Sequence, residues 1–189
     1  SLINMIEVSP HDPATAYLAV SRHKWNDNTP HVFRTTDFGA SWTRLVDGLP
    51  SSEVVRVVRE DPAQRGLLYA GTETGFWVSH DGGGAWQRLQ LNLPAVPITD
   101  IRVHQGDLII ATEGRAFWIL DDIAPIRGVA AARSAEVHLF PPRTTVRSFV
   151  GSNTAAPGMG RNSPQGAIIS LRIDQLDSAA TTKVEFLDQ

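Results

Sequence analysis

Short apolar runs, each bounded by turn residues, follow one another along the first 122 positions of the chain. Their order is the same in two consecutive stretches: a β-prone run, a turn with Asp-Pro, an apolar strand, a loop, a third strand and a hairpin before a fourth. No part of this region has the 3.6-residue periodicity of an amphipathic helix. The predicted strands are residues 6–8, 16–20, 31–35 and one from Trp42 in the first stretch, and 54–58, 67–71, 76–79 and one from Trp86 in the second.

The hairpin of each stretch carries the same eight-residue pattern. TTDFGASW (35–42) and SHDGGGAW (79–86) share Asp, Gly and Trp at matching positions. An Asp in a tight turn accepts hydrogen bonds from backbone N–H groups and a Ser/Thr hydroxyl, and Gly supplies positive φ. The Trp ring can be buried between sheets. These local roles predict structural turns and not catalytic sites. The residues concerned are Thr35, Asp37, Gly39, Ser41, Trp42, Ser79, Asp81, Gly83 and Trp86.

A reduced third copy covers residues 98–122, with Asp121-Asp122 where the hairpin is expected. Four short strands repeated every ~44 residues match the period of a β-propeller blade. We therefore predict an all-β chain with about three four-stranded antiparallel blades. Because a propeller ring needs about four to eight blades, we expect the others from a longer parent chain or from another subunit.

Composition and charge narrow the possible partners. The 189-residue chain has a net charge of −3, so it offers no basic field for nucleic acid. No apolar run approaches the ~18 residues of a membrane helix. The absence of cysteine excludes disulfides and Cys-ligated metals. The six histidines lack the spacing of metal ligands, so no metal and no cofactor is expected.

The repeated turn resembles a known family motif. Residues 35–42 match the pattern Ser/Thr-x-Asp-x-Gly-x-Ser/Thr-Trp of the Asp-box, or BNR repeat, and 79–86 depart from it only at Ala85. The segments 67–86 and 108–123 are similar to large bacterial secreted BNR-repeat proteins of the glycosyl hydrolase type. Sortilin-like receptors, sialidases and xyloglucanases are more distant likenesses. The resemblance implies an extracytoplasmic protein, periplasmic or secreted, that binds carbohydrate or protein.

The repeat stops after Asp122. The predicted organisation is Asp-box blades at 1–125, a connecting segment at 126–150, a Gly/Pro/Ser-rich linker at 151–166 and the first strands of a second β domain at 167–189. The pattern predicts a short helix at 127–135 and strands at 136–140, 168–173 and 183–187. The family resemblance implies that the second domain is an immunoglobulin-like sandwich.

One rim of the blades is the predicted location of a site. With the strands of a blade named A to D, the B–C loops lie at the end opposite the Asp-box turns. These loops are residues 22–30, 73–75 and 113–116, and loops on a rigid scaffold are where binding groups usually lie. The first B–C loop is five residues longer than the second, when each length is counted from the Asp-Pro pair of the A–B turn to the Asp of the Asp-box. Its candidates for ligand binding are Arg22, His23, Trp25 and Asp27, with Lys24 beside them. They could stack on and hydrogen-bond a sugar, or form a solvated loop whose Trp packs on a neighbouring blade.

Glu73 and Glu113 occupy equivalent places in adjacent blades, and Arg115 follows the second as a further ligand-binding candidate. Two carboxylates on one rim are what glycoside hydrolysis requires, although each Glu could instead shape its own turn.

The first hypothesis is therefore a binding scaffold for a glycan or a protein. The alternative is a glycoside hydrolase completed by blades outside this chain, and a third is a sortilin-like peptide receptor. A sialidase is disfavoured because its Arg-Ile-Pro signature is absent.

Overall fold

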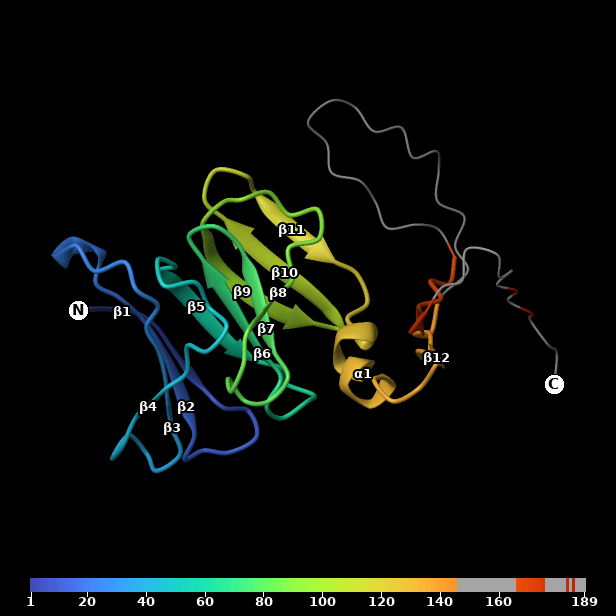
Figure 1. Cartoon of the computed structure of the whole chain (residues 1–189), viewed down its shortest axis with the longest axis horizontal. Helices are drawn as coiled ribbons and strands as arrows, with labels where there is room; N and C mark the ends of the chain where they lie inside the picture. Colours follow the sequence, from blue (N-terminus) through green and yellow to red (C-terminus); the bar gives the residue numbers. More distant parts are fainter. Residues whose placement is uncertain (146–165, 176–182, 184, 186–189) are drawn as a thin grey trace. The chain divides into compact units, whose positions relative to one another are not determined.

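Three antiparallel sheets follow one another along the first part of the chain (Figure 1). The computed structural model describes residues 1–145, 166–175, 183 and 185. The strand order is β1-β2-β3-β4 in the first sheet, β5-β6-β7-β8 in the second and β11-β10-β9 in the third. Consecutive strands are neighbours throughout, which is the up-and-down arrangement of a propeller blade. The predicted fold class, all-β with about three blades, is confirmed.

The strands lie close to their predicted positions. The first sheet contains β1 (Leu2–Val8), β2 (Ala16–Ser21), β3 (Val32–Thr35) and β4 (Thr43–Arg44), with a short 3-10 helix η1 (His23–Trp25). The second contains β5 (Val55–Glu60), β6 (Leu68–Thr72), β7 (Phe76–Ser79) and β8 (Gln87–Arg88). The third contains β9 (Ile98–His104), β10 (Asp107–Thr112) and β11 (Phe117–Leu120).

All three sheets share one irregularity. The pairing of the first two strands slips by one residue at the same place in each sheet. The extra residue is Asn4 in β1, Arg56 in β5 and Thr99 in β9. A β-bulge of this kind bends the strand and re-aims the side chain, and bulges are frequent next to functional sites.

The core lies between the sheets. Strand β5 packs on β1 and β2, and β9 packs on β5 and β6. Between the first and second sheets, Trp86 is almost fully buried. Its indole N–H donates a hydrogen bond to the backbone oxygen of Leu45 at 3.1 Å. The matching Trp42 of the first sheet is 41% exposed. Burial of the turn tryptophan between sheets is therefore complete at one of the two positions.

The third sheet follows the same path as the others up to Ile123. The backbone N–H of Ile123 donates to the backbone oxygen of Gly106 at 2.8 Å. In the second sheet, the N–H of Gly82 donates to the oxygen of Gly66 in the same way, also at 2.8 Å. This places Asp122 at the position that Asp81 has in the second sheet. The chain then enters helix α1 where the other sheets have a fourth strand. The chain accordingly divides into two compact units, Ser1–Ile123 and Ala124–Gln189.

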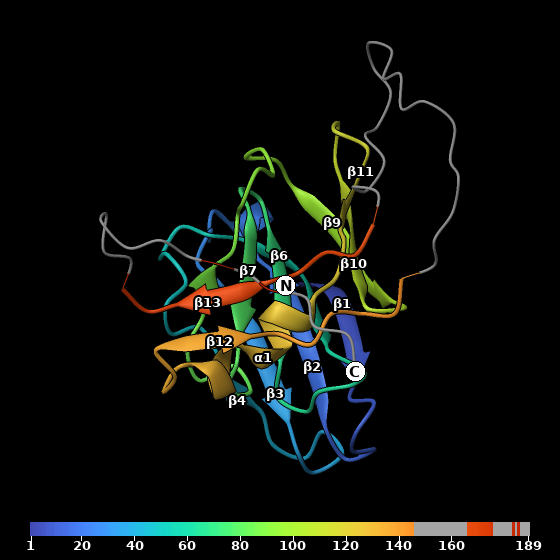
Figure 2. The ribbon, with the colours of Figure 1, turned by 90° about the vertical axis from the view of Figure 1, so that its right-hand side faces the viewer.

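The second unit contains a helix and a hairpin-like strand pair. Helix α1 (Ala124–Ala132) begins three residues before its predicted start, since Pro125 is tolerated in a first helical turn. Strand β12 (Val137–Leu139) pairs antiparallel with β13 (Leu171–Ile173), as Figure 2 shows. Both lie within predicted strands. Among the described residues, no helix is both long and apolar enough to cross a bilayer.

Two predictions fall largely on residues that are not described. The predicted linker at 151–166 lies outside the described residues except for Gly166. The strand predicted at 183–187 also lies outside them, except for Lys183 and Glu185. The immunoglobulin-like sandwich therefore stays a prediction.

Candidate recognition site on the B–C rim

Backbone hydrogen bonds fix which loops share a rim. The N–H of Phe38, in the 35–42 turn, donates to the oxygen of Ala14 in the A–B turn at 3.0 Å. At the other end, the N–H of Glu73 donates to Val54 at 3.1 Å and that of Glu113 to Pro97 at 2.9 Å. The B–C loops therefore lie with the D–A loops on the rim opposite the repeated turns. We call this end the B–C rim.

The first B–C loop is longer than the sequence comparison indicated. Strand pairing joins Ala16 to Thr35, 19 positions later, and Leu68 to Ser79, 11 positions later. The loop thus carries eight additional residues, and the predicted figure of five was wrong. The reason is that the two Asp-Pro pairs do not occupy equivalent positions in their A–B turns. The matching backbone bonds, Ser9 to Thr15 and Asp61 to Leu67, align Pro10 and not Pro13 with Pro62.

Asp27 organises this long loop from within. Its carboxylate accepts hydrogen bonds from the Thr29 hydroxyl at 2.6 Å and the Thr29 N–H at 3.1 Å. These bonds are the main reason that the pKa of Asp27 is lowered to about 2. Arg22 and His31 also contact the carboxylate, at 3.1 and 3.2 Å. Two predicted ligand contacts, Arg22 and Asp27, are thus paired inside the loop, while the Trp25 ring remains exposed.

A hollow of about 380 Å³ opens where the bulges of the three sheets meet the B–C rim. The three bulged residues all line it, so one irregularity repeated in three strands builds one site. Its lining consists of Leu2, Ile3, Asn4, Ser21, His23, Val54, Arg56, Glu73 and Thr99. His23 and Glu73 are the predicted candidates found there. The other candidates, Arg22, Trp25, Asp27, Glu113 and Arg115, are not among the lining residues.

Arg56 connects the two predicted glutamates. Its Nε lies 2.7 Å from Oε1 of Glu73, and its Nη1 lies 3.0 Å from Oε2 of Glu113. The hydrogen bond to Glu73 is the largest contribution that raises the pKa of Arg56, and burial opposes it. A guanidinium thus lies between two carboxylates that a hydrolase would need as an acid and a base. This geometry favours the structural interpretation of the pair.

One residue of the site could not be found from the sequence, and one predicted residue lies outside the site. Arg56 itself was not predicted, because its role depends on the bulge, and a bulge is visible only once strands are paired. Arg115 lies beyond the hollow, and its backbone oxygen accepts the indole N–H of Trp118 at 3.0 Å. Among the described residues, no three side chains of the metal-ligating types come together.

The 35–42 turn holds its carboxylate by local hydrogen bonds. Asp37 accepts from the hydroxyl of Ser41 at 2.5 Å, the N–H of Ser41 at 2.9 Å and the hydroxyl of Thr35 at 2.7 Å. These three bonds, led by the Ser41 hydroxyl, lower the pKa of Asp37 to about 2. Gly39 has φ +89°, the left-handed conformation that the turn requires.

The 79–86 turn repeats this network with one bond fewer. Asp81 accepts from the Ser79 hydroxyl at 2.6 Å and from the N–H of Ala85 at 2.9 Å. Ala85 has no hydroxyl to supply the remaining bond. Burial raises the pKa of Asp81, but the hydrogen bonds outweigh it and the net shift is downward. In both turns the carboxylate is used within the turn, as a structural role requires.

We expect Asp37→Asn to make stability less dependent on pH. The folded-state pKa of about 2 lies below the ordinary value of 3.8, so the charged carboxylate stabilises the fold above about pH 4. That contribution is lost as the pH falls from about 4 to 2. Urea unfolding should find the variant less stable at pH 7, with the difference shrinking towards pH 2. Asp47→Asn, at an exposed position, serves as the control. A difference that stayed constant down to pH 2 would contradict the charge argument.

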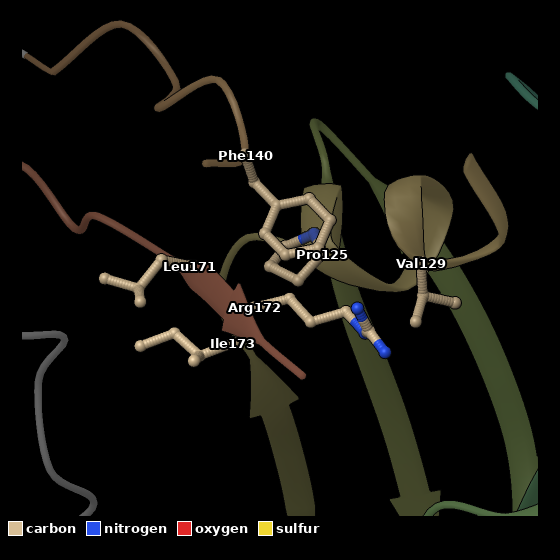
Figure 3. A pocket seen from close by; sticks show the side chains of 6 residues that line it. All are labelled: Pro125, Val129, Phe140, Leu171, Arg172 and Ile173. Atoms are coloured by element: carbon tan, nitrogen blue, oxygen red, sulfur yellow. The ribbon is translucent and has the colours of Figure 1, made fainter. Parts of the chain in front are cut away.

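A second hollow, of about 470 Å³, lies in the second unit between α1 and the β12–β13 pair (Figure 3). Its lining is Pro125, Val129, Phe140, Leu171, Arg172 and Ile173. The one charged group, Arg172, donates to the backbone oxygens of Ala132 at 3.1 Å and Ala135 at 2.8 Å and pairs with Asp174 at 2.5 Å. Its guanidinium is therefore used to fix the end of the helix, and the rest of the lining of this hollow is apolar.

The sheets define the class of the protein as a β-propeller, and comparison with solved structures agrees. A GH74 enzyme from Niastella koreensis has a TM-score of 0.52 and 16% identity, over 64% of this chain and 21% of its own. An ancestral GH74 enzyme has a TM-score of 0.50 and 19% identity, over 61% of this chain and 14% of its own. The matched part thus spans less than a quarter of either enzyme.

A third solved structure, YCF48 bound to a D1 peptide, has a TM-score of 0.46 and 17% identity, over 63% of this chain and 36% of its own. No protein-family model matches the sequence, and no curated protein matches it. At these identities the comparisons establish the propeller fold alone.

Proposed function

We propose that this chain is part of an extracytoplasmic Asp-box propeller of the BNR-repeat type that binds a glycan at the B–C rim. The observation that carries the proposal is the hollow of about 380 Å³ where Asn4, Arg56 and Thr99 converge. A structural turn needs no such convergence, whereas a binding site gains from several polar groups of different kinds on one rigid frame.

The lining of the hollow suits a sugar. The Asn4 amide already donates to the backbone oxygen of Val55 at 3.2 Å and accepts from the Ser21 hydroxyl at 3.1 Å, and the Thr99 hydroxyl donates to Ala111 at 3.3 Å. An amide and a hydroxyl each have further donor or acceptor positions, which the hydroxyls of a sugar ring can use. Leu2 and Ile3 offer apolar surface for its C–H face. A peptide receptor of the sortilin-like kind would require a more uniformly apolar groove. A protein ligand at the same rim is the alternative occupant.

We expect the chain to bind at least one polysaccharide in a panel headed by xyloglucan, measured by isothermal titration calorimetry. His23→Ala, in the hollow, and Trp25→Ala, on the neighbouring loop, should each weaken binding about tenfold, or about 1.4 kcal/mol. Phe38→Ala removes an exposed aromatic ring from the opposite rim and should leave affinity unchanged. The absence of binding to the whole panel, or equal losses in all three variants, would exclude glycan recognition at this rim.

A glycoside hydrolase is the second candidate function. Glu73 lines the hollow, and the similar solved structures include GH74 enzymes. The test is sugar release from the same polysaccharides by the wild type and by Glu73→Gln/Glu113→Gln. Release that disappears in a double variant that is still folded supports catalysis by these two residues. If the wild type binds the polysaccharide without releasing sugar, and the double variant binds equally well, both glutamates have a structural role at the rim.

A further inference from the structure

In the first two sheets, the bulged residue bonds to the residue at which the second strand of the same sheet meets the B–C loop. In the first sheet this pair is uncharged, because the hydroxyl of Ser21 donates to Oδ1 of Asn4 at 3.1 Å. In the second sheet the pair is charged, because Nε of Arg56 donates to Glu73 at 2.7 Å. Strand pairing gives Glu113 the equivalent position in the third sheet.

The bulged residue of the third sheet makes a different bond. Thr99 is uncharged and donates its hydroxyl to the backbone oxygen of Ala111 at 3.3 Å. The Glu113 carboxylate lies instead against Arg56 of the second sheet, at 3.0 Å. Arg56 therefore serves two carboxylates from two different sheets. One positive and two negative groups leave these three side chains, which we call the charged trio, with a formal net charge of −1.

The loop that carries Glu73 is held in place by another carboxylate. Glu53 is 6% exposed and accepts hydrogen bonds from the Thr72 hydroxyl and, at 2.7 Å, from the Thr74 hydroxyl. The loop is thus fixed before any ligand binds, and a fixed loop holds Glu73 beside Arg56 without a further cost on binding.

We propose that Glu73 and Glu113 determine which glycans the hollow accepts. They occupy the guanidinium of Arg56, so the hollow binds an uncharged sugar and rejects a sugar that carries a carboxylate, as uronic acids do. A free arginine would pair with such a carboxylate in its planar fork. With the trio complete, the ligand carboxylate meets a net negative group instead, and like charges placed together oppose binding. This inference rests on the proposed glycan binding at the B–C rim.

The test compares two forms of the same polysaccharide that differ in charge. Xyloglucan and xyloglucan whose free primary hydroxyls have been oxidised to carboxylates form one pair. Fully methyl-esterified and free polygalacturonate form a second pair. In calorimetry at neutral pH and low salt, we expect the wild type to bind the uncharged member at least about tenfold more tightly. In about 0.5 M salt this ratio should fall, because salt screens the repulsion at a partly exposed site.

Glutamine substitutions in the charged trio provide the decisive result. Glu113→Gln should reduce the preference for the uncharged member, and Glu73→Gln/Glu113→Gln should reverse it, because Arg56 is then free to pair with the ligand. Adding Arg56→Gln to the double variant should abolish the reversed preference, since the guanidinium is then absent. Asp47→Asn removes a negative charge at an exposed position outside the lining and should keep the wild-type ratio.

The ratio of the two affinities is the readout, because damage to the fold or to the hollow weakens both members of a pair. If neither the wild type nor any variant binds a member of either pair, the proposed glycan binding fails and this inference fails with it. If uncharged members bind but the glutamine variants keep the wild-type ratio, this inference alone is overturned. A wild type that binds the acidic member equally well or more tightly also overturns it.

Discussion

Arg59→Ala is expected to lower the free energy of unfolding of the first unit by about 3 kcal/mol. The arginine is buried in β5 and bonds to both neighbouring sheets. It contacts Glu7 of the first sheet at 2.5 Å, Asp100 of the third at 2.7 Å and the backbone oxygen of Ile101 at 3.0 Å. Removing one partner of a buried ion pair leaves the other charge uncompensated, which costs more than the pair itself contributes.

The expected loss lies at the lower end of the usual range because Asp100 is partly exposed and can be hydrated. Burial lowers the pKa of Arg59, but its two carboxylate partners outweigh burial and the pKa is raised, so the guanidinium stays charged. Arg59→Lys should lose part of this stability, because an ammonium group cannot bond all three partners in the fork geometry of arginine.

Urea denaturation followed by tryptophan fluorescence measures the effect. The matched control is Arg65→Ala, since Arg65 also bridges two sheets, at 3.3 Å to Asp12, but is exposed. An exposed pair contributes about 0–1 kcal/mol, so the control should change little. Equal losses in the two alanine variants would show that burial of Arg59 does not decide its contribution.

The repeated turns could be predicted from the sequence because their chemistry is local. Asp37 and its partners Thr35 and Ser41 lie within seven residues of one another, so the pattern of residue types already contains the network. The strands followed from the same turns, because the turns delimit the apolar runs. The fold class could therefore be predicted from a repeated pattern of residue types that covers about eighty residues, without any knowledge of packing.

The hollow could not be predicted, because it depends on relations between strands. The bulges at Asn4, Arg56 and Thr99 exist only in the pairing of neighbouring strands, and a polar residue within a β-prone run gives no sign of one. The extra length of the first B–C loop was underestimated for the same reason. Similar Asp-Pro pairs lie at different places in the two turns, and only the strand pairing reveals it.

Trp86→Ala should be the most destabilising single substitution tested, with an expected cost of about 3–5 kcal/mol. The ring is 3% exposed and packs in the cluster between the first two sheets. Alanine would leave a cavity there and an unpaired oxygen on Leu45, which now accepts the indole N–H at 3.1 Å. The neighbouring backbone is tightly packed, since a Cβ added at Gly48 would lie 2.2 Å from the oxygen of Trp86. The surrounding structure can therefore relax little to fill the cavity.

Trp42→Ala makes the same substitution at the same position of the repeat and provides the matched control. Its ring is 41% exposed, and its indole N–H bonds to Gly39 within its own turn, so we expect a loss below about 1 kcal/mol. Trp86→Phe, which keeps most of the apolar surface, should recover most of the loss. Equal losses in the two alanine variants would contradict this prediction. They would show that the tryptophan stabilises the protein through the shared turn pattern and not through burial of the Trp86 ring between sheets.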